Sequence, residues 1–215
     1  MSDKTSIRVF IADDHAIVRE GLKQILAEQR DIVLAGEAET GLDALKLFRK
    51  SRCNVLLLDI SLPDRNGIEV LKQIKDDKPD LAVLMLSMHR EDQYAIRALK
   101  AGAAGYLTKQ SAPKELVVAI RQVAAGQRYV SAQLAQVLAA QVGDGFEKPP
   151  HESLSDREYQ TLTMIASGKT VGEIAQELSL SVKTISEYRS RLLAKMKLKT
   201  SAELTHYAIR NQLID

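Results

Sequence analysis

The fold of this chain is decided by the stretch Val55-Leu56-Leu57-Leu58-Asp59-Ile60-Ser61-Leu62-Pro63-Asp64-Arg65-Asn66-Gly67. Its opening run of apolar residues is typical of a strand that is buried on both faces inside a parallel sheet. The proline and the Asn-Gly pair then indicate a loop, and the pattern from Ile68 onward indicates a helix. Asp59 is therefore expected at the carboxyl end of a central strand, where open α/β sheets place their ligands. The alternative is that Asp59 only caps the loop or the next helix.

The residues on both sides of this stretch alternate between strand and helix patterns. Strands are predicted at residues 7–12, 32–38, 55–59, 81–86 and 105–107. An amphipathic helix pattern follows each strand, as in Val18, Leu22 and Leu26 after the first. Five strands that alternate with five helices predict an α/β fold with right-handed βαβ units and a doubly wound parallel sheet.

The composition is typical of a globular protein from a reducing compartment. With 215 residues, the chain is long enough for one large domain or two small ones. It has no apolar run of about 18 residues, which argues against a membrane span, and the polar segment Met1–Ser6 does not resemble a signal peptide. Cys53 is the only cysteine, so an intrachain disulfide is excluded. Together these features predict a cytoplasmic protein.

Polar side chains collect where the predicted strands end. Asp13 and Asp14 follow the first strand, Asp59 ends the third, Ser87 follows the fourth and Lys109 follows the fifth. The carboxyl ends of parallel strands share one edge of the sheet, so these groups are expected to lie together. Three clustered carboxylates need a cation, and oxygen ligands suit Mg²⁺. With a lysine and a hydroxyl beside them, they form the set that a phosphoryl group on a carboxylate requires.

Residues 7–126 resemble the receiver domain of bacterial two-component response regulators. The resemblance is carried by Asp13-Asp14, by Asp59 to Gly67, by Ser87 and by Tyr106-Leu107-Thr108-Lys109. It implies a flavodoxin-like fold in which Asp59 accepts phosphate from a phosphohistidine on a sensor histidine kinase.

The resemblance also implies a metal site. Asp14, Asp59 and the backbone carbonyl of Ser61 would hold Mg²⁺, and Asp13 would help through a water molecule. One position departs from the family pattern nearby, because Leu62 stands where the family usually has methionine. The two side chains have similar volumes, so this replacement conserves volume.

A switch is implied by three further residues. Lys109 would pair with the phosphoryl oxygens, Ser87 would move to bond one of them, and Tyr106 would swing inward behind it. Taken singly, these residues could also be a solvated lysine, a helix cap and a core tyrosine. The family often has a cis proline after the lysine, but here the residue is Gln110, for which a cis bond costs about 3 kcal/mol.

A connector follows the sheet domain. Leu134, Val137 and Leu138 indicate a linker helix, and Gly143-Asp144-Gly145 and Pro149-Pro150 then interrupt regular structure. We predict a mobile linker at about residues 143–152. The predicted domains are a receiver at 7–126, a linker with a short helix at 127–150 and a small all-α domain at 151–215.

The C-terminal segment has the pattern of a helix-turn-helix. Ser155 and Glu158 form the signature of a capping box before the first helix. A second helix is predicted over residues 170–178, Ser179-Leu180-Ser181 form a tight turn, and a longer helix runs from Val182 to Met196.

Positive charge is concentrated on that longer helix and its end. Six basic residues oppose only Glu187 between residues 182 and 199, which gives this segment a net charge of +5. They are Lys183, Arg189, Arg191, Lys195, Lys197 and Lys199. A basic helix of this kind is a signature of DNA binding, although many basic helices are only solvated surfaces.

Residues 154–209 resemble the LuxR-type helix-turn-helix of the NarL/FixJ response regulators. The motifs that carry the resemblance are Leu154 to Glu158, Ile165 to Gly168, Glu173 to Ala175, Leu178, Leu180-Ser181, Lys183 to Ile185, Leu193 and Lys195 to Leu198. By family position, Ser186, Glu187 and Ser190 would face base edges, and the backbone phosphates would be contacted mainly by Lys183, Thr184, Tyr188, Arg189 and Arg191. Glu187 could accept a hydrogen bond from a cytosine amino group; alternatively, it only tempers the charge of the helix.

The sequence as a whole indicates a phosphorylation-controlled, DNA-binding transcription regulator. The expected partners are a sensor histidine kinase, double-stranded DNA with inverted-repeat-like sites, a second copy of the chain on activation, and RNA polymerase as a further candidate. One alternative is a magnesium-dependent phosphatase of the haloacid-dehalogenase type, but such enzymes need an aspartate where Ser61 stands, and no cap domain is visible. Another is a binding module that works without phosphorylation; the acidic pair and Lys109 argue against it.

Overall fold

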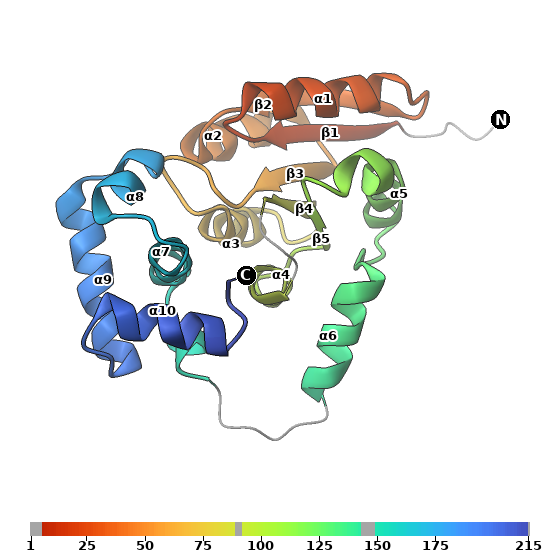
Figure 1. Ribbon diagram of the computed structural model, residues 1–215. Coiled ribbons are helices and arrows are strands. Elements are labelled where there is room, and N and C mark those ends of the chain that lie inside the picture. Colours follow the sequence, from red (N-terminus) through yellow and green to blue (C-terminus); the bar gives the residue numbers. More distant parts are fainter. Residues whose placement is uncertain (1–5, 89–91, 143–148, 215) are drawn as a thin grey trace. The chain divides into compact units, whose positions relative to one another are not determined.

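The computed structural model describes residues 6–88, 92–142 and 149–214 (Figure 1). The chain forms two compact units, Met1–Gly143 and Asp144–Asp215, which we call the sheet unit and the helical unit. Within the described residues, no helix is both long enough and apolar enough to cross a membrane. The domain limits at 7–126, 127–150 and 151–215 stay a prediction.

Five parallel strands form the centre of the sheet unit, in the order β2-β1-β3-β4-β5. They are β1 (Ile7–Ala12), β2 (Ile32–Ala38), β3 (Val55–Asp59), β4 (Ala82–Ser87) and β5 (Gly105–Thr108). The predicted parallel sheet is confirmed, with β4 and β5 each ending one residue later than expected. Every residue of β3 is buried, because this apolar strand lies in the middle of the sheet.

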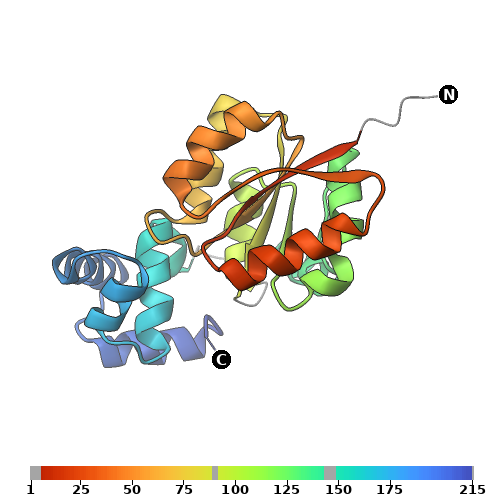
Figure 2. The same ribbon diagram turned by 90° about the horizontal axis from the view of Figure 1, so that it is seen from above.

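Five helices cover both faces of the sheet (Figure 2). They are α1 (Ala16–Ala27), α2 (Gly41–Ser51), α3 (Gly67–Asp77), α4 (Asp92–Lys100) and α5 (Ala112–Ala124). Helices α1 and α5 pack on one face, where Leu22, Leu116 and Ile120 meet Val9 and Leu57 in a buried apolar cluster. Helices α2, α3 and α4 cover the opposite face. The doubly wound arrangement follows from the chain crossing the sheet in both directions from β1.

The register of the strands brings the polar residues to one edge. Ala12 pairs with Leu58, so Asp13 lies beside Asp59 at the ends of β1 and β3. Ser87 pairs with Thr108, so Lys109 follows directly at the end of β5. The parallel arrangement therefore gathers side chains that are far apart in the sequence.

The loop after β3 is held tightly against the strand end. Gly67 begins α3, and a Cβ atom at this position would lie 2.0 Å from the carbonyl oxygen of Asp59. Only glycine permits this close approach. The Gly67 amide donates to the Ile60 carbonyl at 2.7 Å, and the Asn66 side chain caps α3 by accepting from the Ile68 amide at 2.9 Å. The loop that carries Ser61 thus has a defined conformation.

The segment after α5 returns to the edge of the sheet. The Tyr129 amide donates to the Ala104 carbonyl at 2.9 Å, and Tyr129 forms a single parallel bridge with Gly105. The predicted linker helix is present as α6 (Ala132–Val142). Residues 143–148 of the predicted mobile linker lie outside the described residues. At the other end of the predicted linker, Pro150–Ser153 form a short 3-10 helix, η1, where no regular structure was predicted.

The helical unit contains α7 (Asp156–Ala166), α8 (Val171–Glu177), α9 (Val182–Met196) and α10 (Ser201–Arg210). The capping box that the sequence predicted is present, with Ser155 and Glu158 each accepting a hydrogen bond from the other's backbone amide. A core forms where apolar residues of α7, α8 and α9 meet; its buried members are Met164, Ile165, Ile174, Ala175, Leu178 and Ile185.

The predicted helix-turn-helix is formed by α8, a short turn and α9. Ser179 adopts a positive φ of 52°, which reverses the chain direction. Ser181 then caps α9, because its hydroxyl accepts a hydrogen bond from the Thr184 amide at 3.0 Å. The rest of α9 is fixed by burial of Ile185, Leu192 and Met196, so its opposite face is left at the surface.

Candidate functional site

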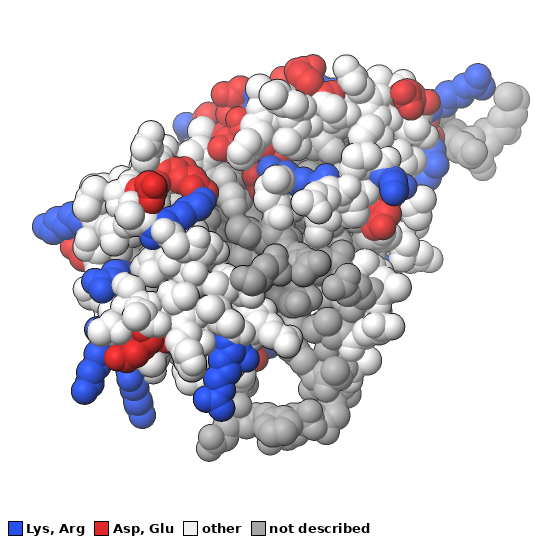
Figure 3. Space-filling model, viewed as in Figure 1, with Lys and Arg blue, Asp and Glu red and all other residues white. Residues whose placement is uncertain are grey.

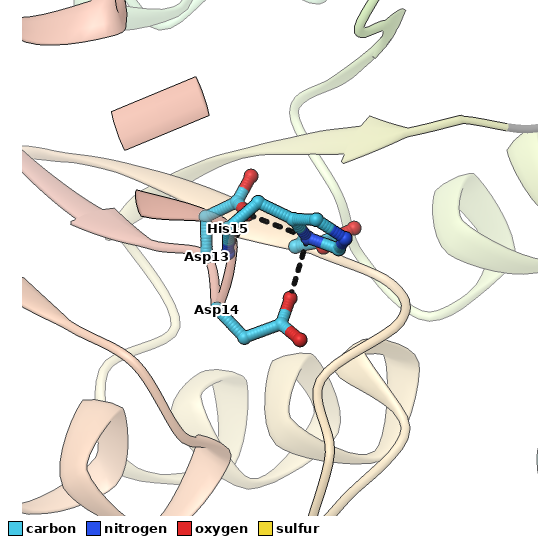
Figure 4. Close-up of side chains that lie close together, drawn as sticks. Asp13, Asp14 and His15 are labelled. Carbon is cyan, nitrogen blue, oxygen red and sulfur yellow. Dashed lines mark hydrogen bonds and ion pairs between the residues drawn. The ribbon is translucent and has the colours of Figure 1, made fainter. Parts of the chain in front are cut away.

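The polar strand ends of the sheet unit form one acidic pocket. Ligand atoms of Asp13, Asp14, His15 and Asp59 all lie within 4.8 Å of one another. Figure 4 shows the first three of these side chains converging after β1. Asp13 and Asp59 are buried, whereas Asp14 is about one-third exposed. The gathering of carboxylates that the sequence predicted is therefore present, with Asp14 on its open side.

Lys109 provides the positive charge in this pocket. Its Nζ lies 2.7 Å from Asp13 Oδ2 and 2.7 Å from Asp59 Oδ2. The Lys109 side chain is only 5% exposed, so these contacts are shielded from solvent. The alternative that Lys109 is a solvated surface lysine is thereby wrong.

The pKa values of Asp59 and Lys109 are both raised above their ordinary values in this pocket. Burial raises the pKa of the Asp59 carboxyl, against the attraction of Lys109. Burial lowers the pKa of the Lys109 ammonium, but the Asp59 and Asp13 carboxylates outweigh it and the pKa of Lys109 is raised. Lys109 therefore stays charged at neutral pH. The pocket thus contains one ammonium group and three carboxyl groups. This excess of acidic groups suits a divalent cation.

The donors in the pocket fit a hard metal ion. Carboxylate and carbonyl oxygens are the ligands that Mg²⁺ prefers, and Asp13, Asp14 and Asp59 supply three carboxyl groups within bridging distance of one ion. The Ser61 amide donates to Asp59 Oδ1 at 3.2 Å, which fixes the start of the loop and with it the backbone of Ser61 next to the carboxylates.

Ser87 and Tyr106 lie inside the sheet unit. Ser87 ends β4 and is fully buried, and the backbone carbonyl of Ser87 accepts a hydrogen bond from the Lys109 amide at 2.7 Å. Tyr106 is fully buried on β5, beside Met85 of β4. This burial agrees both with a core tyrosine and with the inward position, so the movement that the family resemblance implies for Tyr106 stays a prediction. The peptide bond after Lys109 is trans.

Two residues near the pocket were not predicted from the sequence. His15 Nδ1 lies 2.8 Å from Asp14 Oδ1 and 3.3 Å from Asp13 Oδ1 (Figure 4). Arg19 of α1 donates from Nη1 to the backbone carbonyl of Asp13 at 2.7 Å. The position of His15 directly after the acidic pair was a usable signal. The contact of Arg19 depends on where α1 packs, which the sequence pattern does not specify.

The predicted DNA-binding residues lie along α9 in the helical unit. Lys183, Ser186, Glu187, Ser190 and Arg191 are exposed. Thr184 and Tyr188 are half-buried, and Thr184 bonds the capping hydroxyl of Ser181. The three residues expected to face base edges therefore share the surface opposite the core.

Two of the basic residues of the α9 segment have partners on other helices of the helical unit, and Arg191 lies 3.5 Å from Glu187 of α9 itself. Arg189 is half-buried and donates from Nε to the Ser201 hydroxyl of α10 at 2.9 Å. Lys195 forms an ion pair with Glu158 of the capping box at 2.6 Å. The positive charge available to a polyanion is thus smaller than the net charge of the segment indicates. Figure 3 shows basic side chains along the edge of the helical unit where α9 lies.

Comparison with protein families matches both units. Residues 9–121 match the response regulator receiver domain, and residues 152–208 match the bacterial regulatory proteins of the luxR family. The chain is 41% identical over 208 residues to the response regulator UvrY of Escherichia coli, covering 96% of this chain and 95% of UvrY. It is 39% identical over 213 residues to the response regulator GacA of Pseudomonas aeruginosa, covering 97% and 98%.

Solved structures of RcsB, the first of them from Salmonella typhimurium, are similar along most of the chain. One has 28% sequence identity and a TM-score of 0.68, and covers 94% of this chain and 96% of RcsB. A second, an RcsB–DNA complex, has 28% identity and a TM-score of 0.60, with coverage of 94% and 97%.

These matches exclude the phosphatase reading, because the family consists of phosphoacceptor transcription regulators rather than enzymes. The chain belongs to the NarL/FixJ family of two-component response regulators, in which a receiver domain is joined to a DNA-binding, LuxR-type helix-turn-helix.

Proposed function

We propose that Asp59 is the phosphoacceptor through which a sensor histidine kinase controls this regulator. The observation that carries the proposal is the position of its carboxylate at the end of β3, next to Asp13 and 2.7 Å from Lys109 Nζ. Asp13 shares this burial and the contact with Lys109, but Asp59 is the carboxylate that ends the central strand β3 and is followed by the loop that carries Ser61.

The same geometry supports Mg²⁺ as the cation of the pocket. Asp14, Asp59 and the Ser61 carbonyl would bind it directly, with Asp13 acting through water. When bound, Mg²⁺ neutralises charge on the phosphoryl oxygens and favours the ionised form of Asp59.

The residues of the chain then have distinct tasks in the transfer. A carboxylate oxygen of Asp59 forms the new O–P bond, while the P–N bond to the kinase histidine breaks and leaves its electron pair on the imidazole. The Lys109 ammonium lies where it can follow the negative charge from Asp59 to the phosphoryl oxygens. Ser87 and Tyr106 form the switch that senses the new group.

We also propose that α9 is the element that reads DNA. Ser186, Glu187 and Ser190 would face the base edges, and backbone phosphates would be contacted mainly by Lys183, Thr184, Tyr188, Arg189 and Arg191. RcsB supports this, because structures show two RcsB dimers bound to two DNAs and RcsB bound to a promoter in the presence of a phosphomimetic.

On that basis this chain acts as a homodimer on inverted-repeat-like sites after phosphorylation, with RNA polymerase as a further partner and the cytoplasm as its compartment. The domain limits that fit this function are 7–126 and 151–215.

Intact-mass measurement tests the phosphoacceptor directly. The protein is incubated with acetyl phosphate and Mg²⁺, and we expect wild type to gain one phosphoryl group. Asp59→Asn should gain none, because the amide is isosteric but a poor nucleophile. Asp64→Asn is the matched control from the same loop and should be labelled like wild type. Equal labelling of Asp59→Asn and wild type would overturn the assignment.

A further inference from the structure

Asp13 is held through all of its polar groups. Its amide donates to the Ala38 carbonyl at 3.1 Å, and its Oδ1 accepts from the His15 amide at 2.9 Å. Its Oδ2 lies 2.7 Å from Lys109 Nζ, and its backbone carbonyl accepts from Arg19 Nη1 at 2.7 Å. Arg19 is the only one of these partners that reaches the strand end from inside a helix.

Arg19 is built into the sheet unit as a buried, charge-balanced group. Its side chain is 9% exposed, and its two acidic partners are Glu37, near the end of β2, and Glu39, just after the strand. Nη2 is paired with the Glu39 carboxylate, and Nε lies 3.6 Å from Glu37 Oε2. A planar guanidinium with partners on several sides has a fixed orientation. Figure 3 shows the acidic side chains that gather over this part of the surface.

We propose that Arg19 is a positioning residue for the metal site, which it serves by fixing the backbone between β1 and the acidic pair. The inference rests on the Mg²⁺ site of the proposed function. Mg²⁺ demands near-ideal octahedral geometry at about 2.0–2.1 Å, so a small displacement of Asp13 and Asp14 weakens its binding. Arg19 does not touch the cation; it acts through the Asp13 carbonyl.

A positioning role for Arg19 and a purely electrostatic role predict opposite effects of its removal on the affinity for Mg²⁺. A positive charge near the pocket repels a cation, so removing it should tighten Mg²⁺ binding if charge were its only role. Removing the guanidinium also leaves the buried Asp13 carbonyl without its donor, which favours a rearranged backbone. The positioning role therefore predicts weaker binding despite the lost positive charge.

Lys23 provides a matched control on the same helix. It pairs with Glu37 at 3.0 Å, so it balances the same carboxylate as Arg19, and it also pairs with Glu20, but it does not contact Asp13. Lys23→Gln removes the same charge as Arg19→Gln while leaving the contact to Asp13 in place.

The experiment is calorimetric titration of the full-length protein with Mg²⁺. We expect Arg19→Gln to raise the Kd for Mg²⁺ by about 10- to 100-fold, the usual effect of losing an outer-shell partner. Lys23→Gln should change it by less than about twofold, because Lys23 does not contact Asp13 and its charge, on a partly exposed side chain, is screened by salt. Arg19→Lys keeps the charge without the forked donor geometry and should fall between wild type and Arg19→Gln.

Controls distinguish the loss of a positioning role from a failure to fold and from the absence of a Mg²⁺ site. Circular dichroism establishes that each variant is folded, and Arg19→Lys serves as the deciding variant if Arg19→Gln does not fold. Arg19 variants that bind Mg²⁺ as tightly as wild type, or more tightly, would overturn the positioning role alone. A wild-type protein that binds no Mg²⁺ would overturn the metal site and this inference with it.

Discussion

Lys109 is the residue on which the stability of the acidic pocket depends most directly. Its ammonium contacts two buried carboxyl groups, Asp13 and Asp59, and brings a compensating charge to both. Removal of one member of a buried ion pair leaves the other charge uncompensated, which is strongly destabilising. The same lysine is the counter-charge in the proposed phosphoryl transfer, so its structural and chemical roles are linked.

We therefore expect Lys109→Met to lower the free energy of unfolding of the sheet unit by about 3 kcal/mol in the absence of divalent cations. Saturating Mg²⁺ should recover part of this loss, since the cation supplies the missing positive charge. Urea unfolding with and without Mg²⁺ measures both quantities. Lys114→Met, which removes an exposed lysine of α5, is the control. If Lys109→Met loses the same unfolding free energy with and without Mg²⁺, the lysine and the cation do not neutralise the same carboxylates.

At the scale of the elements, Asp64 joins the loop after β3 to the beginning of α2, the helix that precedes β3. Its two carboxylate oxygens accept from the Gly41 amide at 2.7 Å and the Leu42 amide at 2.9 Å, both at the beginning of α2. A carboxylate at a helix N-terminus satisfies free amides and interacts favourably with the helix dipole. Asp64→Ala should lower the free energy of unfolding by about 1–2 kcal/mol. Asp64→Asn keeps one acceptor oxygen and should lose about half as much in the same urea experiment; equal stability of all three proteins would contradict this role.

The capping box of α7 makes the stability of the helical unit depend on pH. Burial raises the pKa of Glu158, but its bonds to Lys195 and Ser155 outweigh this, so the pKa lies below its ordinary value of 4.5. A carboxyl whose pKa is lowered on folding stabilises the fold above its unfolded pKa, and this stability is lost as the pH falls through the folded value.

The melting temperature of the helical unit should therefore be lower for Glu158→Gln than for wild type at pH 7, and the difference should shrink as the pH falls below about 4.5. Glu177→Gln is the control, since Glu177 pairs with Lys169 at the surface and exposed pairs contribute little. A difference between Glu158→Gln and wild type that is constant from pH 7 to pH 3 would contradict the ionic role of Glu158.

We expect helix α9 to combine residues that supply affinity with residues that set sequence preference. Lys183→Ala should weaken specific and non-specific DNA binding together and lower the salt slope by about one unit per protomer. Glu187→Ala should instead change the preferred site by about 1–3 kcal/mol at one base pair. Binding selections on randomised DNA at two salt concentrations distinguish the two. If Lys183→Ala changes the recovered motif and Glu187→Ala only lowers the affinity, the opposite face of α9 lies against the base edges.

At the scale of the whole molecule, the sequence predicts what depends on local patterns and on the geometry of parallel sheets. The apolar run before Asp59 and the sharing of strand ends were enough to bring Asp13, Asp59 and Lys109 together. The contacts of Arg19 and Asp64 could not be predicted in this way, because each joins a helix to a loop whose relative positions are set by packing. The ion pair of Lys195 with Glu158 spans 37 residues and likewise has no local pattern.

The two units connect a chemical event in one domain to DNA binding by another. The proposed switch residues Ser87 and Tyr106 would have no purpose in a receiver without a responsive output, and a helix-turn-helix alone would bind DNA independently of the kinase. The account therefore requires that phosphorylation of Asp59 changes the affinity of the full chain for its DNA.

Fluorescence anisotropy tests this claim most directly. The affinity of full-length wild type and of Asp59→Asn for a DNA site recovered by selection is measured with and without acetyl phosphate, with Mg²⁺ present throughout. We predict that the phosphodonor raises the affinity of wild type and leaves that of Asp59→Asn unchanged. An equal response of both proteins, or no response of wild type that has been shown to carry the phosphoryl group, would contradict the account.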